Sequence, residues 1–129
     1  MPPLHDLYSS NYPNMHIDEF REYCLKRQGV TEEFPFDNST LVFKVKGKMF
    51  ALCNVERYES FNLKCDPERA IELRELHPDL IKPGYHMSEK HWNTVSAEGL
   101  QPKLQKELID HSYDLVVASL PKRVQSELK

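Results

Sequence analysis

Hydrophobic and polar positions alternate most regularly in LVFKVKGKMFALCNV, which covers residues 41–55. A period of two residues is typical of a β-strand that buries one of its faces. In the first half of this stretch every second position is strongly apolar: Leu41, Phe43 and Val45. Gly47-Lys48 can form a two-residue turn, because glycine adopts positive φ without strain. We therefore predict a β-hairpin at residues 41–55, followed by a third alternating strand at residues 60–65.

The predicted turn determines which side chains share each face of the hairpin. Val45 would lie opposite Phe50, and Phe43 opposite Leu52, so that one face is apolar and should be covered by helices. The other face, which we call the predicted lysine face, would carry polar side chains from these strands: Lys44, Lys46, Asn62 and Lys64. Five basic residues against two acidic ones give residues 41–65 a net charge of +3, whereas the whole chain has a net charge of −3. The lysine face is either a surface for phosphate groups or a solvated face whose lysines discourage edge-to-edge aggregation.

Residues before this hairpin predict a helix and a short extended piece. In IDEFREYCLKRQG, apolar residues recur at helical spacing, and Gly29 is a natural stop. The stripe consists of Ile17, Phe20 and Cys24. Residues 30–40 then contain Pro35 and a polar cluster, which indicate an extended piece followed by a turn.

The second half of the chain contains further helices with clear boundaries. In DPERAIELRELHPD, Asp66 fits the N-cap and Pro67 the first helical position. A long helix with a broad apolar face is predicted from Pro102 until just before Pro121. Residues 122–129 can form a short terminal helix.

The segment GYHMSEKHWNTV, residues 84–95, gathers histidines, aromatic residues, a lysine and an asparagine in a short stretch. We expect a second hairpin here, with its tip at residues 88–90. Side chains alternate along the strand after the tip, so Trp92 and Asn93 would face opposite sides. If Trp92, the single tryptophan of the chain, anchors the hairpin to the body, then His91 and Asn93 would join the predicted lysine face.

The predicted elements follow in the order helix, strand meander, helix, hairpin and helix. Consecutive strands joined by tight turns form an antiparallel sheet, and helices segregated from strands indicate an α+β fold. We therefore predict a two-layer sandwich in which helices cover one face of an antiparallel β-sheet. One domain would span residues 15–129, preceded by an irregular N-terminal arm at residues 1–14. A chain of 129 residues is long enough to bury a core of its own.

Composition fits a soluble globular protein, because 40% of the residues are hydrophobic and 29% are charged. No apolar run approaches the ~20 residues of a membrane span, and the first residues do not resemble a signal peptide. The three cysteines form no C-x-x-C pair and are expected to be buried and reduced: Cys24, Cys53 and Cys65. We therefore expect a cytoplasmic protein.

Motifs for catalysis or for metal binding are weak. His86 and His91 lie five residues apart, but no Asp, Glu or Cys at a matching spacing completes a set of metal ligands. DHSYD, residues 110–114, brings Asp, His and Ser together in sequence only, because neighbours on a helix point about 100° apart. The four glycines are scattered and form no phosphate-binding loop. We therefore expect no enzyme, no metal and no cofactor.

Several separated motifs resemble one known family. They are EFREYCL, FPFD, LVFKVKGKMFAL, NLKCDPERA, GYHMSEKHWNTV and ELIDHSYDLVVASLPK. In this order, over about residues 15–129, they resemble the MmcQ/YjbR-like family of small bacterial proteins, above all in the K-H-W-N run and in HSYDLV. The resemblance implies a CyaY-like α+β domain. It also implies DNA binding through a "double wing", in which β-hairpins flank a saddle-shaped sheet.

Carried over to this chain, the wings would be the hairpin around Gly47-Lys48 and the segment 88–92. The side chains that would face DNA are Lys44, Lys46, Lys64, Lys90, His91 and Asn93. The leading hypothesis is a non-enzymatic module that binds the phosphate backbone of double-stranded DNA through its basic sheet face and its hairpins. The alternative is a protein-interaction or small-anion-binding domain that uses the same surface. A third hypothesis, an enzyme, would require a deep pocket that holds Tyr85, His86 and His91.

Overall fold

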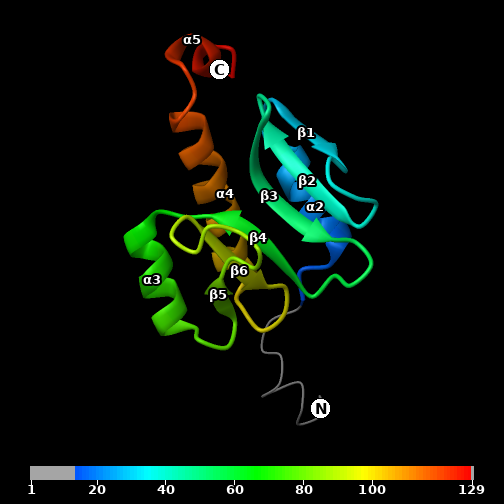
Figure 1. Cartoon of the computed structure of the whole chain (residues 1–129), viewed down its shortest axis with the longest axis vertical. Coiled ribbons are helices and arrows are strands. Elements are labelled where there is room, and N and C mark those ends of the chain that lie inside the picture. Colours follow the sequence, from blue (N-terminus) through cyan, green and yellow to red (C-terminus); the bar gives the residue numbers. More distant parts are fainter. Residues whose placement is uncertain (1–13, 129) are drawn as a thin grey trace.

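The computed structural model describes residues 14–128, so the predicted arm at residues 1–14 lies outside the described residues except for Asn14. Its elements follow the predicted order, as Figure 1 shows. The elements are α2 (Ile17–Leu25), β1 (Val30–Glu33), β2 (Thr40–Val45), β3 (Lys48–Asn54), β4 (Ser60–Lys64), α3 (Pro67–Leu76), β5 (Ile81–Pro83), β6 (Trp92–Ser96), α4 (Pro102–Ala118) and α5 (Lys122–Ser126).

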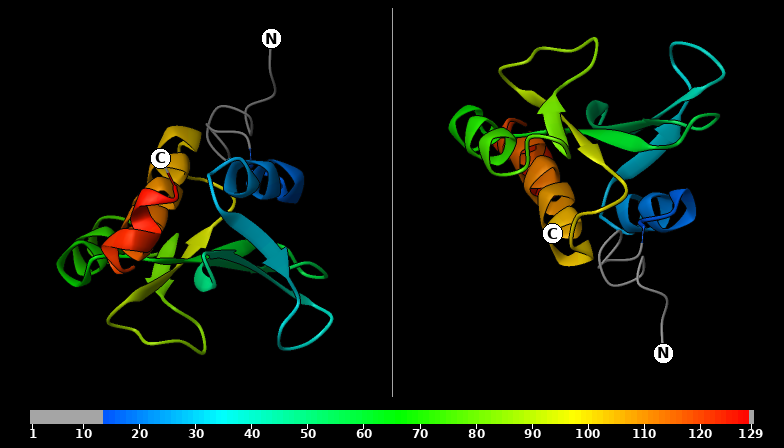
Figure 2. Two further views of the ribbon diagram at one scale, coloured as in Figure 1. Left: turned by 90° about the horizontal axis from the view of Figure 1, so that it is seen from above. Right: turned by 90° about the horizontal axis from the view of Figure 1, so that it is seen from below.

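Within the described residues the strands form one six-stranded sheet in the order β1-β2-β3-β4-β6-β5, and every pairing is antiparallel. Helices α2 and α4 lie on one side of this sheet, and α3 lies at the edge formed by β5 (Figure 2). We call the side occupied by α2 and α4 the covered face, and the opposite side the open face. The predicted two-layer α+β arrangement is confirmed.

The core lies between the covered face and the helices, and it is rich in aromatic rings. Phe20 of α2 stacks on Phe61 of β4 with 4.4 Å between ring centroids, and it meets Phe43 of β2 edge-on at 5.5 Å. Phe50 of β3 meets Tyr113 of α4 edge-on at 5.5 Å. The residues that the alternation assigns to this face are buried, with one exception treated below: Leu41, Phe43, Val45 and Phe50. This core holds the sheet rigid and leaves its other face available.

The turn of the first hairpin differs from the prediction by one residue. Lys46 and Gly47 form it, with φ of 49° and 85°, and Val45 pairs with Lys48. Both central positions of a tight hairpin turn require positive φ, and glycine serves only one of them here. The sequence therefore located the turn correctly, but it did not determine which two residues occupy the central positions of the turn.

A bulge in β3 compensates for this shift. Phe43 pairs with Ala51, but the next pair is Lys44 with Met49. Phe50 therefore has no partner in β2. Phe50 and Ala51 are both fully buried, and the bulge lets these two neighbours lie on the same side of the sheet. Beyond the bulge, Leu52 pairs with Val42 on the open face. The predicted place of Leu52 in the core is therefore wrong.

The helices begin at the predicted residues, although α2 already ends at Leu25. They attach to the sheet through polar as well as apolar contacts. The Asp66 side chain accepts a hydrogen bond from the Arg69 amide at 3.1 Å, which makes Asp66 the N-cap of α3. In α4, the buried Ser112 hydroxyl accepts from the Lys64 amide at 2.9 Å and donates to the Phe50 carbonyl. Ser112 therefore links α4 to β4 and to the bulge in β3.

Candidate functional site

Two loops project from the sheet on the open face, residues 34–39 between β1 and β2 and residues 84–91 between β5 and β6 (Figure 2). The 34–39 loop is shaped by Asp37, whose side chain accepts hydrogen bonds from the Ser39 and Thr40 amides at 2.8 and 2.7 Å. These donors favour the charged carboxylate and lower the pKa of Asp37. The loop leaves Phe36 with 66% of its surface exposed.

The 84–91 loop is held by its own backbone and by α3. The Gly84 amide donates to the Trp92 carbonyl at 2.8 Å, and the Trp92 amide donates to the Ser88 carbonyl at 3.0 Å. The Arg74 guanidinium of α3 donates to the Glu89 carbonyl at 2.9 Å. The loop therefore has a fixed base and a tip that is tied to a helix.

Tyr85 stands at the base of this loop with 71% of its surface exposed. Its amide donates to Thr94 Oγ1 at 3.0 Å, and that hydroxyl donates to Asn62 Oδ1 at 2.6 Å. The His86 ring lies against the Tyr85 ring, with 4.0 Å between their centroids. His86 adopts a positive φ of 59° to do so, an uncommon backbone conformation for a non-glycine residue.

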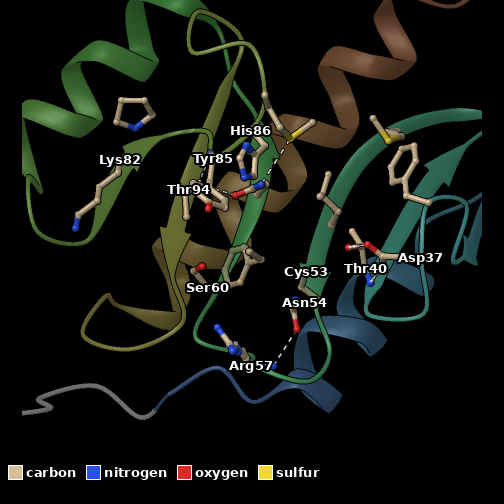
Figure 3. A pocket seen from close by; sticks show the side chains of 17 residues that line it. Asp37, Thr40, Cys53, Asn54, Arg57, Ser60, Lys82, Tyr85, His86 and Thr94 are labelled. Carbon is tan, nitrogen blue, oxygen red and sulfur yellow. Dashed lines mark hydrogen bonds between the residues drawn. The ribbon is translucent and has the colours of Figure 1, made fainter.

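A groove of about 770 Å³ runs over the open face between the two loops (Figure 3). Its apolar lining includes Met49 and Leu52 of β3 and Met87 of the 84–91 loop. Phe36 and Tyr85 line it from the two loops. We call it the open-face groove. Its volume lies in the range of sites that bind small molecules or parts of larger ligands.

Two cations also line the open-face groove, Arg57 from the β3–β4 connection and Lys82 from β5 (Figure 3). Both are exposed. In the part of the chain that the structure describes, neither side chain has a carboxylate partner within ion-pair distance. The groove therefore combines an apolar lining with two cations that form no ion pair, and the Asp37 carboxylate also lines it.

The residues of the predicted lysine face occupy different environments. Lys44 forms an ion pair with Glu33, and Lys46 lies 3.5 Å from the Glu127 carboxylate. The other two lysines of the prediction and His91 have no carboxylate partner among residues 14–128: Lys64, Lys90 and His91. Lys64 is half-buried, whereas Lys90 and His91 are exposed on the 84–91 loop. The structure therefore divides the predicted lysines into two that are paired with a carboxylate and two that are not.

The predicted orientation of Asn93 is wrong. Asn93 is 2% exposed and pairs with Leu63, whose side chain belongs to the core. Its amide nitrogen donates to the Ala70 carbonyl of α3 at 3.5 Å. Trp92 pairs with Lys64 and is 9% exposed, so it is buried on the side of the sheet opposite to Asn93. A Cβ at Gly84 would lie 2.7 Å from Trp92 Cβ, which shows how closely the loop approaches.

The tip of the first predicted wing does not line the open-face groove. The tip of the β2–β3 hairpin packs towards the C-terminal end of the chain, where Lys46 meets Glu127 and Lys48 Nζ lies 3.4 Å from Ser119 Oγ. The element that stands beside the groove is the 34–39 loop instead (Figure 2). The second predicted wing, residues 88–92, lies in and next to the 84–91 loop.

Sequence reasoning did not find most of the groove: Phe36, Met49, Leu52, Arg57, Lys82 and Met87. One signal was present in FPF at residues 34–36, where two phenylalanines flank a proline that disfavours a central strand. Both rings are largely exposed, Phe34 at 48% and Phe36 at 66%. Aromatic residues in a turn-forming segment thus marked an exposed site.

The three thiols are free and buried, as predicted. Burial raises the pKa of Cys53 to about 12 and of Cys65 to about 11, and it raises the pKa of Cys24 as well. A thiol with a raised pKa carries little of the thiolate that reacts or binds metal near neutral pH. These positions therefore serve packing.

Tyr85 and His86 line the groove, but His91 does not, so the structure does not bring both histidines into it. Within residues 14–128 no group of three or more His, Cys, Asp and Glu side chains could hold a metal ion. In the same residues no helix has the length and apolar character needed to span a membrane.

Comparison with known proteins identifies relatives over most of the chain. The family model described as YjbR matches residues 25–115. The protein YbdF of Escherichia coli O157:H7 is 41% identical over 98 residues, which cover 74% of this chain and 80% of that protein. The protein YjbR of Escherichia coli K12 is 35% identical over 109 residues, which cover 83% of this chain and 92% of that protein.

Two solved structures share the fold. The Deinococcus radiodurans protein DR2400, of domain family DUF419, matches with a TM-score of 0.82 and 42% identity. That match covers 87% of this chain and 86% of the other. A protein from Pseudomonas syringae matches with a TM-score of 0.65 and 27% identity over 78% of this chain and 98% of its own.

Proposed function

This chain belongs to the YjbR family, and from that premise we propose that it is a non-enzymatic DNA-binding protein whose open face contacts the phosphate backbone. The observation that carries the proposal is a group of cations on the open face and its loops that no carboxylate of the described residues balances. Four cations of the open face and its loops have no carboxylate partner among residues 14–128: Arg57, Lys64, Lys82 and Lys90. Uncompensated cations gathered on one surface attract phosphates at little cost in lost ion pairs.

Arginines next to the covered-face helices are compensated within the protein. Arg27 reaches Asp110 at 2.6 Å and Asp114 at 3.3 Å, and Arg69 reaches Glu107 at 2.6 Å. A ligand phosphate would have to displace these carboxylates. The acidic net charge of the chain is therefore compatible with a local basic surface, because part of the acidic charge is engaged elsewhere.

The shape of the open face supports the same proposal. The 34–39 and 84–91 loops rise from the sheet on the same side (Figure 2), and the groove between them is lined by Arg57 and Lys82. Raised loops beside a basic surface can straddle a nucleic-acid backbone. This arrangement corresponds to the saddle of a "double wing" with the 34–39 loop in place of the β2–β3 hairpin.

The proposed contacts revise the predicted set. Lys64, Lys90 and His91 remain, and Arg57 and Lys82 join them. Lys44 and Lys46 contribute less, since their charges are balanced by Glu33 and Glu127. Asn93 takes no part, because it is buried beneath α3.

The test is a fluorescence-anisotropy titration of labelled duplex DNA at two salt concentrations. We expect affinity to fall as salt rises, because each phosphate that is neutralised releases bound counterions. The triple variant Arg57→Glu, Lys64→Glu, Lys82→Glu should lose most of this binding. The variant Lys103→Glu, Lys122→Glu, Arg123→Glu changes the net charge equally on α4 and α5 and should retain much more.

Equal losses in the two triple variants would contradict the assignment to the open face. A folded parent that binds no DNA at low salt would overturn the proposal. The alternative, a protein-interaction or small-anion-binding domain without catalytic activity, would then take its place.

A further inference from the structure

The open-face groove has a feature that phosphate contacts leave unexplained, namely its apolar lining. Met49, Leu52 and Met87 line it, and all three are only half-buried. An intact duplex presents mainly phosphates, sugars and polar base edges to a protein. Against a duplex these three side chains would lose contact with water and find little apolar surface in return. An exposed apolar patch beside cations indicates a ligand with both characters.

We infer that the open-face groove receives unstacked bases, so that the protein prefers single-stranded or locally melted DNA to intact duplex. This inference rests on the proposed DNA-binding function and adds the state of the DNA that is bound. An unpaired nucleotide has the two characters that the groove requires, a flat apolar base and a charged phosphate. Arg57 and Lys82 line the same groove and would hold the phosphates while the bases turn inward.

Aromatic side chains in both loops provide stacking surfaces. Phe36 and Tyr85 line the groove from opposite loops and are 66% and 71% exposed. Tyr85 is braced by its contact with the His86 ring at 4.0 Å and by the hydrogen bond from its amide to Thr94. A braced ring loses little conformational freedom when a base stacks on it. Bases stack on aromatic rings without regard to sequence, since every base has a π-face.

The groove also contains one underused hydrogen-bond donor. The oxygen of Asn62 accepts from Thr94, but among residues 14–128 its nitrogen has only the Met87 sulfur at 3.6 Å as an acceptor. A thioether is a weak acceptor. The Asn62 amide can therefore donate to a carbonyl or ring nitrogen of a base that enters the groove.

The test compares three labelled DNAs of about 20 nucleotides under one low-salt condition: oligo-dT, a matched duplex, and the duplex with a central mismatched bubble. The parent should bind oligo-dT and the bubble more tightly than the matched duplex. Each stacked base is expected to contribute about fivefold to a hundredfold in affinity. Phe36→Ala, Tyr85→Ala should remove most of that preference and leave the salt dependence unchanged, because the cations remain.

Phe34→Ala is the matched control, since Phe34 is an exposed ring of the same segment that does not line the groove. It should keep the preference, and circular dichroism would confirm that all variants are folded. Equal affinity of the parent for all three DNAs would overturn this inference and leave the proposed function intact. Binding to none of them would overturn both, and a peptide segment would then be the occupant to examine.

Discussion

The two faces of the sheet differ in what covers them. On the covered face, Phe20, Phe43 and Phe61 form one aromatic cluster, and the Ser112 hydroxyl pairs with two backbone groups. On the open face, methionines and a leucine are half-buried, and Arg57 and Lys82 have no carboxylate partner in residues 14–128. Helices of the protein itself cover one face, whereas no helix among residues 14–128 covers the other. Under the proposed function, folding and binding are divided between the two sides of one sheet.

The assignment of residues to the two faces can be tested most strongly at the bulge in β3. There Phe50 lies on the covered face and Leu52 on the open face. Phe50→Ala should lower the free energy of unfolding by about 3–5 kcal/mol, because it empties a fully buried site. Leu52→Ala should cost clearly less, since the groove already leaves Leu52 half-buried. Urea denaturation of both variants measures the two values. A larger loss for Leu52→Ala than for Phe50→Ala would reverse the assignment of the faces.

A smaller effect is expected at the polar link between α4 and the sheet. Ser112→Ala leaves the Lys64 amide and the Phe50 carbonyl without their partner. Removing one partner from buried polar groups costs about 1–3 kcal/mol. Ser126→Ala is the control, because that exposed hydroxyl bonds only within α5 and should change the urea midpoint little. Indistinguishable midpoints for the two variants would contradict the proposed role of Ser112.

A pH-dependent effect should follow from His111 of α4. Its Nε2 accepts a hydrogen bond from the Asp66 amide at 3.2 Å. Partial burial, aided by the nearby Arg69 charge, lowers the pKa of His111 from 6.5. Because the unfolded chain then binds the proton more tightly, stability should be lost as the pH falls from about 6.5 through the pKa of the folded state.

His111→Gln keeps an acceptor at this position but does not titrate. The decrease in urea midpoint between pH of about 7.5 and about 5.5 should therefore be smaller in the variant than in the parent. An identical decrease in both proteins would show that His111 does not contribute to the pH dependence. This experiment concerns the covered side alone, so the open-face account does not depend on it.

The smallest effect on stability is expected on the open face itself. Lys64→Gln and Lys44→Gln should each change the free energy of unfolding by less than about 1 kcal/mol, as is usual for solvent-accessible charges. Their effects on DNA binding should differ, because Lys64 has no carboxylate partner in the described chain and Lys44 has Glu33. Lys64→Gln should reduce the salt slope by about one, and Lys44→Gln by less. A larger reduction for Lys44→Gln would contradict the role given to charge compensation.

Local signals in the sequence predicted most of the fold. Asp66 and Pro67 begin α3 as their capping chemistry requires, and the alternation of Phe43 and Val45 identifies the covered face. Leu52 was assigned to the wrong face because a bulge in β3 changes which residues pair. No residue near the bulge signals it in the sequence. Register within a hairpin depends on turn geometry as well as on alternation.

The candidate site was harder to predict, because it depends on loops that are far apart in sequence. Trp92 was correctly expected to be buried, but burial was taken to mean the covered face. In the structure Trp92 is buried on the open-face side of the sheet, so the next residue, Asn93, turns into the core. Likewise, Phe36 and Tyr85 are brought to one groove only by the strand order of the sheet. The pattern of apolar and polar residues along the chain indicates which residues of a strand share a face. It does not indicate which segment covers that face.

The central claim, that the open face is the binding surface, is tested most directly by mapping amide chemical shifts in a ¹⁵N-labelled sample titrated with oligo-dT. We predict that the largest shifts fall on the 34–39 and 84–91 loops and on the strand residues between them, including Leu52, Asn62 and Lys82. Amides of α4 and α5 should move little. Largest shifts on α4 and α5, with the two loops unchanged, would contradict the account.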